Sequence, residues 1–366
     1  MPVTSAIVEF DNSTGQIYST AREKAVVCEV QAARFGKITM QMKALQVVRP
    51  RSFDQIQIGI PRLPIEGDGY ILIRTAWVSM CGSDIPFFTG NKRFRSYPLS
   101  PGAPIHECIG EVVESASEEF HPGDWVLAIP DGDQGLAEFF LARTSKAVVL
   151  DRDLEDLGTA CIIQPLSTVL NAIDRLGDLR EKSFAVVGLG SIGLFFIWLA
   201  AKSGAGSVVG IDPCTDRCRM AEALGATRTF CRRSIEVVHR ARAIPGEWNP
   251  PDICVEAVGH QMDTINDCLE LVRKYGTVAA FGVPDHAVYA LEYEIFFRKN
   301  ALLMATVTPD WTDYLAKARD LYMTNREELS KFVTHRLPIR DAEKAFSMYE
   351  RHEEGLVKAI LDARGW

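Results

Sequence analysis

The chain has 366 residues, of which 47% are hydrophobic and 24% charged, and its formal net charge is -8. This length corresponds to about two domains, and the acidic balance excludes partners that need a basic face, namely nucleic acid and anionic membrane surfaces. The nine cysteines include no Cys-x-x-Cys pair, which indicates free thiols and a cytoplasmic location.

Residues 1–41 are predicted to be an N-terminal extension, because Met42 opens a new strand pattern, MKALQVV. An alternative for part of this extension is a small hairpin formed by AIVEF and QIYST, with its turn at residues 12–15.

Residues 42–177 are predicted to form a β-rich domain. Between residues 42 and 147, short apolar runs are separated by Pro/Gly turns: YILIRTAWVS, IGEVVES, DWVLAIP and AEFFLA. Short strands separated by such turns are typical of a small β-barrel or β-sandwich. Residues 157–176 are predicted as a helix that leads out of the domain.

Residues 178–305 change character, because apolar strands now alternate with helical patterns: FAVVGLG, SIGLFFIWLAAKSG, SVVGID, DICVEAVG and TVAAFGV. This alternation predicts a parallel sheet covered on both faces. The uncharged run 184–201 is just long enough to span a membrane, but its glycines favour a buried strand and helix. Residues 306–366 end in the strand pattern VKAILD and are predicted to return to the first domain.

A glycine-rich turn follows the first strand of the second domain and opens a helix. Gly188, Gly190 and Gly193, with Ser191 and Ile192 between them, match the dinucleotide-binding pattern G-x-G-x-x-G. The first glycine permits the tight turn, the second lets the diphosphate approach, and the third allows close packing of helix on strand. The helix N-terminus then offers unpaired N–H groups to the phosphates.

Asp212 ends the next predicted strand, where a carboxylate accepts hydrogen bonds from the ribose hydroxyls of the cofactor. The same carboxylate repels a 2′-phosphate, so NAD is expected in preference to NADP. Arg217 follows closely and suits either a ribose or a phosphate.

Cys81, His106 and Glu107 supply a thiol, an imidazole and a carboxylate within one segment of the first domain. Zinc binds this mixture of donors, and a catalytic zinc keeps one position open for substrate. A metal that polarises an oxygen, beside a cofactor that takes hydride, predicts an oxidoreductase.

Four motifs occur in the order and approximate spacing of a known family: Cys-Gly-Ser-Asp at 81–84, Pro-Gly-x-Pro-x-His-Glu at 101–107, Pro-Leu-Ser at 165–167 and the glycine turn at 188–193. From residue 42 onward the chain resembles the medium-chain zinc-dependent alcohol dehydrogenases, especially their polyol, threonine and glucose dehydrogenase branch. The resemblance implies an α/β fold, in which a Rossmann-type doubly wound parallel sheet is joined to a β-rich GroES-like catalytic domain. It also implies a homodimer or homotetramer.

By this resemblance, Cys81 and His106 are zinc ligands, Glu107 is a ligand or a neighbouring carboxylate, and Gln164 faces the metal. Ser83 bonds the substrate hydroxyl and begins a proton relay, while Asp84 holds the His106 imidazole. The resemblance places Thr168 against the nicotinamide and assigns further cofactor contacts to Val258, Gly259 and Val283.

The sequence departs from the family pattern at four places. Ile105 replaces a glycine before the His-Glu pair, Pro86 replaces a relay histidine, and Gln164 is a neutral donor. The four-cysteine lobe that binds structural zinc is absent, so one catalytic zinc per chain is expected. Lys92, Arg93 and Arg95 form a cationic stretch that we interpret as a solvated loop, with attraction of a phosphate or carboxylate on the substrate as the alternative.

The function predicted from these residues is zinc-dependent hydride transfer between NAD and the alcohol of a sugar, polyol or related small molecule, with the matching ketone or aldehyde as product. Two alternatives stay open at this point. One is a metal-free NAD(P)H-dependent quinone or enone reductase of the same fold. The other is a non-catalytic nucleotide-sensing protein.

Overall fold

The structure is a computed structural model that describes residues 10–11, 16–17, 41–64, 69–91, 96–353 and 355–366. Within the predicted extension, β1 (Phe10–Asp11) pairs antiparallel with β2 (Gln16–Ile17), as the hairpin alternative requires. The other residues of the extension up to residue 40, and the cationic stretch 92–95, lie outside the described residues.

Four antiparallel strands close into a small barrel in the first domain. Each strand pairs with the next along the chain, and the last also pairs with the first. A separate hairpin of two strands lies against this barrel through a bridge between Ala44 and Ala137. The barrel strands are β5 (Tyr70–Ser79), β6 (Glu107–Ser115), β7 (Trp125–Pro130) and β8 (Phe139–Val149), and the hairpin strands are β3 (Gln41–Arg49) and β4 (Ser52–Gly59).

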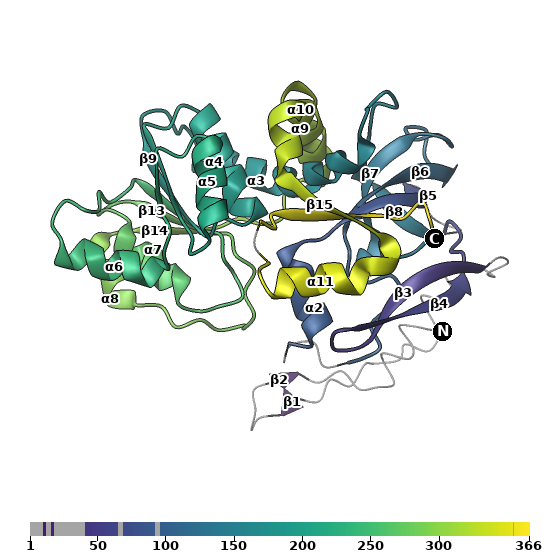
Figure 1. Ribbon diagram of the computed structural model, residues 1–366, viewed down its shortest axis with the longest axis horizontal. Helices are drawn as coiled ribbons and strands as arrows, with labels where there is room; N and C mark the ends of the chain where they lie inside the picture. The colour runs from purple at the N-terminus through teal and green to yellow at the C-terminus, as the bar shows by residue number, and fades with distance from the viewer. Residues whose placement is uncertain (1–9, 12–15, 18–40, 65–68, 92–95, 354) are drawn as a thin grey trace, which may run out of the picture.

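The C-terminal segment returns to this barrel, as predicted. Strand β16 (Lys358–Asp362) pairs antiparallel with β5, and β15 (Val333–Pro338) adds to it in parallel. Helix α11 (Ala342–Glu350) joins these two strands. Figure 1 shows these last elements, in yellow, on the side of the molecule that holds β5 to β8.

The second domain contains a six-stranded sheet in which every neighbouring pair is parallel. Counted along the chain, its strand order is 3-2-1-4-5-6, which is the Rossmann order with its switch point between β9 and β12. The predicted fold class is confirmed, while the domain boundaries at residues 177 and 305 stay predictions. The strands are β9 (Ser183–Val187), β10 (Ser207–Ile211), β11 (Arg228–Phe230), β12 (Ile253–Glu256), β13 (Thr277–Ala280) and β14 (Leu302–Ala305).

Helices cover the sheet and connect the two domains (Figure 1). The predicted helix over residues 157–176 is divided, because residues 157–162 form the tighter 3-10 helix η3 before α3 begins. The α-helices are α2 (Ile85–Thr89), α3 (Ile163–Leu176), α4 (Ser191–Lys202), α5 (Thr215–Ala223), α6 (Ser234–Ala243), α7 (Thr264–Leu271), α8 (Tyr293–Lys299), α9 (Trp311–Thr324), α10 (Arg326–Leu329) and α11; the 3-10 helices are η1 (Gly82–Asp84), η2 (Asp131–Asp133), η3 (Leu157–Ile162), η4 (Ser330–Phe332) and η5 (Ile339–Asp341).

Burial explains the long uncharged run at residues 184–201. It forms β9 and α4, and eight residues of α4 are buried on all sides by protein, with Phe195 stacked on Phe332 at 4.2 Å between ring centroids. No helix among the described residues has both the length and the apolar character needed to cross a bilayer.

One hydrophobic core extends from the barrel into the parallel sheet. Ile109 and Leu127 of the barrel belong to the same buried cluster as Phe184 and Val186 of β9. Helix α3 lies between them and buries ten of its residues. The two domains are therefore joined through a shared core that includes α3.

Candidate functional site

Asp84 organises the segment that carries the predicted metal ligands. Its carboxylate accepts the backbone N–H of Cys81 at 2.8 Å, which closes the short η1 turn. Its other oxygen lies 3.1 Å from Nδ1 of His106. Because Asp84 is 1% exposed, both contacts form away from solvent and fix the thiol and the imidazole relative to each other.

The electrostatics of His106 follow from this contact. Burial by itself lowers the pKa of the imidazole, but the charge and hydrogen bond of Asp84, helped by Cys81, raise that pKa well above its usual value. With Nδ1 facing Asp84, Nε2 is the nitrogen that remains for a metal.

Behind the imidazole, Glu107 forms a salt bridge with Lys358, and both residues are 0% exposed. The ammonium nitrogen lies 2.7 Å from Oε1 and 2.6 Å from Oε2, and it also donates to the carbonyl of Met80 at 2.8 Å. Burial opposes the charge on Lys358, but Glu107 raises the pKa of the ammonium group. Tyr349, whose pKa burial raises to about 12, donates to the same Met80 carbonyl.

The donor atoms fit a zinc ion. One atom each from Cys81, His106 and Glu107 lie within 4.8 Å of one another. Tetrahedral zinc separates such ligand atoms by about 3.4–3.8 Å, so small side-chain shifts suffice. No other group of three metal-binding side chains occurs in the part of the chain that the structure describes.

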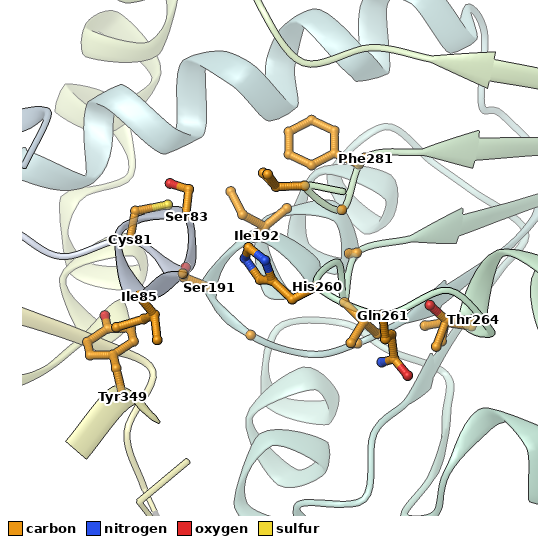
Figure 2. Close-up of a pocket in the computed structure, with 18 of the residues that line it drawn as sticks. Cys81, Ser83, Ile85, Ser191, Ile192, His260, Gln261, Thr264, Phe281 and Tyr349 are labelled. Atoms are coloured by element: carbon orange, nitrogen blue, oxygen red, sulfur yellow. The ribbon is translucent and has the colours of Figure 1, made fainter. Parts of the chain in front are cut away.

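The remaining residues predicted on the metal side line the same cavity as Cys81 and His106. Ser83, Gln164 and Thr168 all border it, and Figure 2 shows Ser83 beside Cys81. The Thr168 hydroxyl donates to the carbonyl of Pro165 at 2.7 Å, which orients its side chain on the first turns of α3.

Ile105 is accommodated without disturbing the metal segment, because it points into the barrel core and is fully buried. The neighbouring space exists only because residue 135 is glycine: a Cβ there would lie 2.3 Å from Cys108 Sγ and 3.0 Å from Ile105 Cγ2.

The glycine turn has the geometry that its sequence predicts. Gly188 has φ +92°, which only glycine adopts at low cost, and a Cβ on Gly193 would lie 1.8 Å from the Gly188 carbonyl. A Cβ on Gly190 would meet nothing within 4 Å, so the space beside it is open to a ligand. Ser191 and Ile192 begin α4 and line the cavity.

Asp212 lies at the end of β10, beside the glycine turn. Its two carboxylate oxygens accept the N–H groups of Leu189 and Cys214, both at 2.8 Å. Arg217 Nη1 is 3.7 Å from Asp212, and both side chains line the cavity. The carboxylate is held rigidly where a ribose would bind.

A fourth buried carboxylate, Glu256, organises the loops that carry the remaining predicted cofactor contacts. It accepts the N–H groups of Val258 and Gly259 at 3.0 Å and the hydroxyl of Thr264 at 2.8 Å. It also accepts the N–H of Gly282, at 3.2 Å, next to Val283. Val258 and Val283 line the cavity, whereas Gly259, also predicted as a cofactor contact, does not.

Cys81, His106, the glycine turn and Asp212 border one cavity of about 1340 Å³ between the domains, whereas the buried Glu107 is not part of its lining. Figure 2 shows Cys81 and Ser83 on one side, Ser191 and Ile192 in the middle, and Gln261 and Thr264 on the far side. A molecule that reaches from Asp212 to Cys81 therefore passes the glycine turn on its way.

Sequence reasoning missed several residues of this site. One sequence feature could have pointed to Lys358: it is a charged residue inside the apolar strand pattern VKAILD. Glu256 had a similar signal in the pattern DICVEAVG, but His260 and Asp285 follow strands in loops with no motif of their own.

Comparisons with known proteins agree with this arrangement. Residues 158–363 match the family described as "Glucose dehydrogenase C-terminus", and residues 67–148 match "Alcohol dehydrogenase GroES-like domain". The chain is 25% identical to L-threonine 3-dehydrogenase of Caldanaerobacter subterraneus over 83% of this chain and 94% of that protein. It is 25% identical to glucose 1-dehydrogenase of Metallosphaera sedula over 88% and 98%, respectively. The structure of an alcohol dehydrogenase from Thermus sp. ATN1 superposes with a TM-score of 0.75 and 25% identity, covering 88% of this chain and 100% of that one.

Two glycine substitutions are expected to separate folding from cofactor binding. Gly193→Ala forces the start of α4 away from Gly188 and is expected to lower the free energy of unfolding by about 1–3 kcal/mol. Gly190→Ala fits the backbone, so stability changes by less than about 0.5 kcal/mol, but NADH affinity falls about tenfold or more because the methyl occupies the phosphate approach. Urea unfolding and NADH fluorescence titration measure the two effects. Equal affinities for wild type and Gly190→Ala would contradict the assignment.

Removing one charge of the Glu107–Lys358 pair is expected to lower folding stability more than removing both charges. Lys358→Met leaves Glu107 unpaired and should cost about 3–5 kcal/mol of folding stability. The double variant Lys358→Met/Glu107→Gln buries no net charge and should regain most of the loss. Thermal unfolding of chelator-treated protein tests this prediction, and a double variant no more stable than the single one would disprove it.

Proposed function

The chain belongs to the zinc-type medium-chain alcohol dehydrogenases, in their polyol branch, and from this premise we propose that it oxidises the secondary or primary alcohol of a sugar, a polyol or a related small molecule with NAD. One observation carries the proposal: the ligand set around Cys81 and the glycine turn at Gly188 border a single cavity. The domain match to glucose dehydrogenases and the similarity to threonine and glucose dehydrogenases support the substrate class.

The residues that would hold the metal are Cys81, His106 and Glu107, with Gln164 at the adjoining wall. When bound there, zinc lowers the pKa of the substrate hydroxyl, and nicotinamide accepts hydride from its carbon. Ser83, which lines the cavity, would receive the hydroxyl proton and pass it to water, because Pro86 has no group that can carry it.

The salt bridge with Lys358 decides how much negative charge Glu107 brings to the proposed metal site. Because Lys358 neutralises Glu107 within the protein, the Cys81 thiolate is the charge that faces the metal, and Gln164 adds none. We propose one catalytic zinc per chain. Strands β7 and β8 are connected by a short link through η2, and the sequence lacks the four-cysteine lobe that would bind a structural zinc.

Preference for NAD over NADP rests on Asp212. Its carboxylate is fixed by two backbone N–H groups beside the glycine turn, so it is unable to swing away from a 2′-phosphate. Arg217 contacts this carboxylate and offsets part of its charge, so the preference for NAD is expected to be partial rather than absolute.

Neither the metal-free reductase nor the nucleotide-sensing alternative is favoured by an observation.

The proposed function is tested by metal analysis followed by a substrate panel. We expect one zinc per chain, and chelation or Cys81→Ala should abolish NADH formation from polyols, sugars or threonine. The ratio of kcat/KM for NAD over NADP should exceed one. Metal-free protein that reduces quinones or enones at full rate would reject this function in favour of the reductase alternative.

We also propose that two copies pair through β14, the edge strand of the parallel sheet. Leu302 is 59% exposed on this strand, and on the neighbouring helix α8 Tyr293 and Phe297 are 65% and 66% exposed. An apolar sheet edge of this kind is suited to a second copy related by two-fold symmetry.

A cytoplasmic location is proposed on separate grounds, because the eight cysteines of the described residues are free thiols.

Sedimentation tests this pairing. Wild type should sediment as at least twice the chain mass of 40.6 kDa, and Leu302→Lys/Phe297→Glu should sediment as the single chain. Ile244→Lys, at another exposed apolar position after α6, serves as the control and should leave the assembly unchanged. Persistence of the dimer in the double variant would place the interface elsewhere.

A further inference from the structure

Asp285 joins the two domains by a pair of hydrogen bonds. The side-chain amide of Asn91, in the domain that carries the metal ligands, donates to Asp285 Oδ2 at 2.7 Å. Asp285 Oδ1 lies 2.7 Å from Nδ1 of His260, which belongs to the nucleotide-binding domain. All three side chains line the cavity described above, so the bridge crosses the cleft at its margin.

Each end of the bridge is firmly attached to one part of the site. Asn91 follows α2, which starts directly after the η1 turn, and its N–H donates to the carbonyl of Pro86 at 3.1 Å. Asp285 follows β13, and its N–H donates to the Tyr289 hydroxyl at 2.9 Å. A movement of Asp285 relative to Asn91 is therefore a movement of the nucleotide-binding loops relative to the metal segment.

His260 connects the bridge to the middle of the cleft. Its backbone has φ 55°, an uncommon conformation for a residue with a side chain, and its N–H donates to the carbonyl of Val283 at 2.8 Å. Figure 2 shows its ring beside Ile192, between the segment of Cys81 and Ser83 and the position of Gln261. Asp285 thus holds an imidazole where the glycine turn and the metal segment face each other.

The bridge is partly shielded from water. The side chains of Asp285 and His260 are 16% and 29% exposed, so these hydrogen bonds compete with less solvent than bonds at the open surface. A hydrogen bond to a carboxylate in such surroundings is stronger than one between neutral groups at the surface.

We propose that Asp285 is a positioning residue that latches the two domains together around the cofactor. Hydride transfer needs its two carbons about 3–3.5 Å apart, and a misplacement of about 1 Å costs about a hundredfold in rate. The bridge from Asn91 through Asp285 to His260 keeps the metal segment and the glycine turn at one separation. The latch deepens the proposed function and rests on it, because it assigns to this chain a means of holding the two halves of the NAD(H) site at one separation.

An exchange of the two bridge partners tests the latch. Asn91→Asp sets a second carboxylate against Asp285 and should weaken NADH binding to the zinc-loaded enzyme about tenfold. Adding Asp285→Asn rebuilds the bridge with reversed roles, because the new amide donates to Asp at 91 and its oxygen still accepts from His260. The double variant should return to within about twofold of wild type. Asn249→Asp, an equal charge change on an exposed loop, is the control and should bind NADH as wild type does.

Small-angle scattering of the cofactor-free protein measures the contact between the domains without relying on the reaction. The radius of gyration should rise in Asn91→Asp and return to the wild-type value in the double variant. Scattering and NADH affinity that are unchanged in Asn91→Asp, or that the exchange fails to restore, would overturn the latch. If wild type bound neither NADH nor NADPH while scattering followed the expected pattern, the dehydrogenase function would be refuted, whereas the bridge between the two domains would be upheld.

Discussion

The salt bridge between Glu107 and Lys358 is the constraint on which the rest of the site depends. Two opposite charges with no exposed surface are tolerable only when each is paired and hydrogen-bonded. This requirement ties β16, near the end of the chain, to β6 beside the metal ligands. Lys358 also neutralises the charge of Glu107, so the proposed metal site would take its negative charge from Cys81 alone.

Carboxylates organise the other parts of the cleft in the same way. Asp84 fixes the Cys81 backbone and the His106 ring, and Glu256 gathers the loops after β12 and β13. Asp212 holds the start of the glycine turn to the end of β10. In each case a buried carboxylate that is hydrogen-bonded to the protein sets distances before any ligand arrives, and such preorganisation is the main contribution of a protein to a reaction that its cofactors perform.

Much of this arrangement was predictable because its signals are local. The glycine turn follows its strand directly, and Cys81, His106 and Glu107 lie within one short segment, so composition and spacing suffice. Lys358 was not predicted as the partner of Glu107, because the two are 251 positions apart and only the pairing of β16 with β5 brings them together. Strand β4 and helix α8 were missed for another reason: neither contains a fully buried residue, so the apolar periodicity that marks an element is weak there.

The position of Lys358 also bears on the order in which the protein matures. The strands of the parallel sheet all lie in the chain between β6, which carries Glu107, and β16, which carries Lys358. A barrel that folded first, as N-terminal domains do during synthesis, would bury the Glu107 carboxylate without its ammonium partner. The surroundings of Glu107 are therefore complete only when β16 has paired with β5.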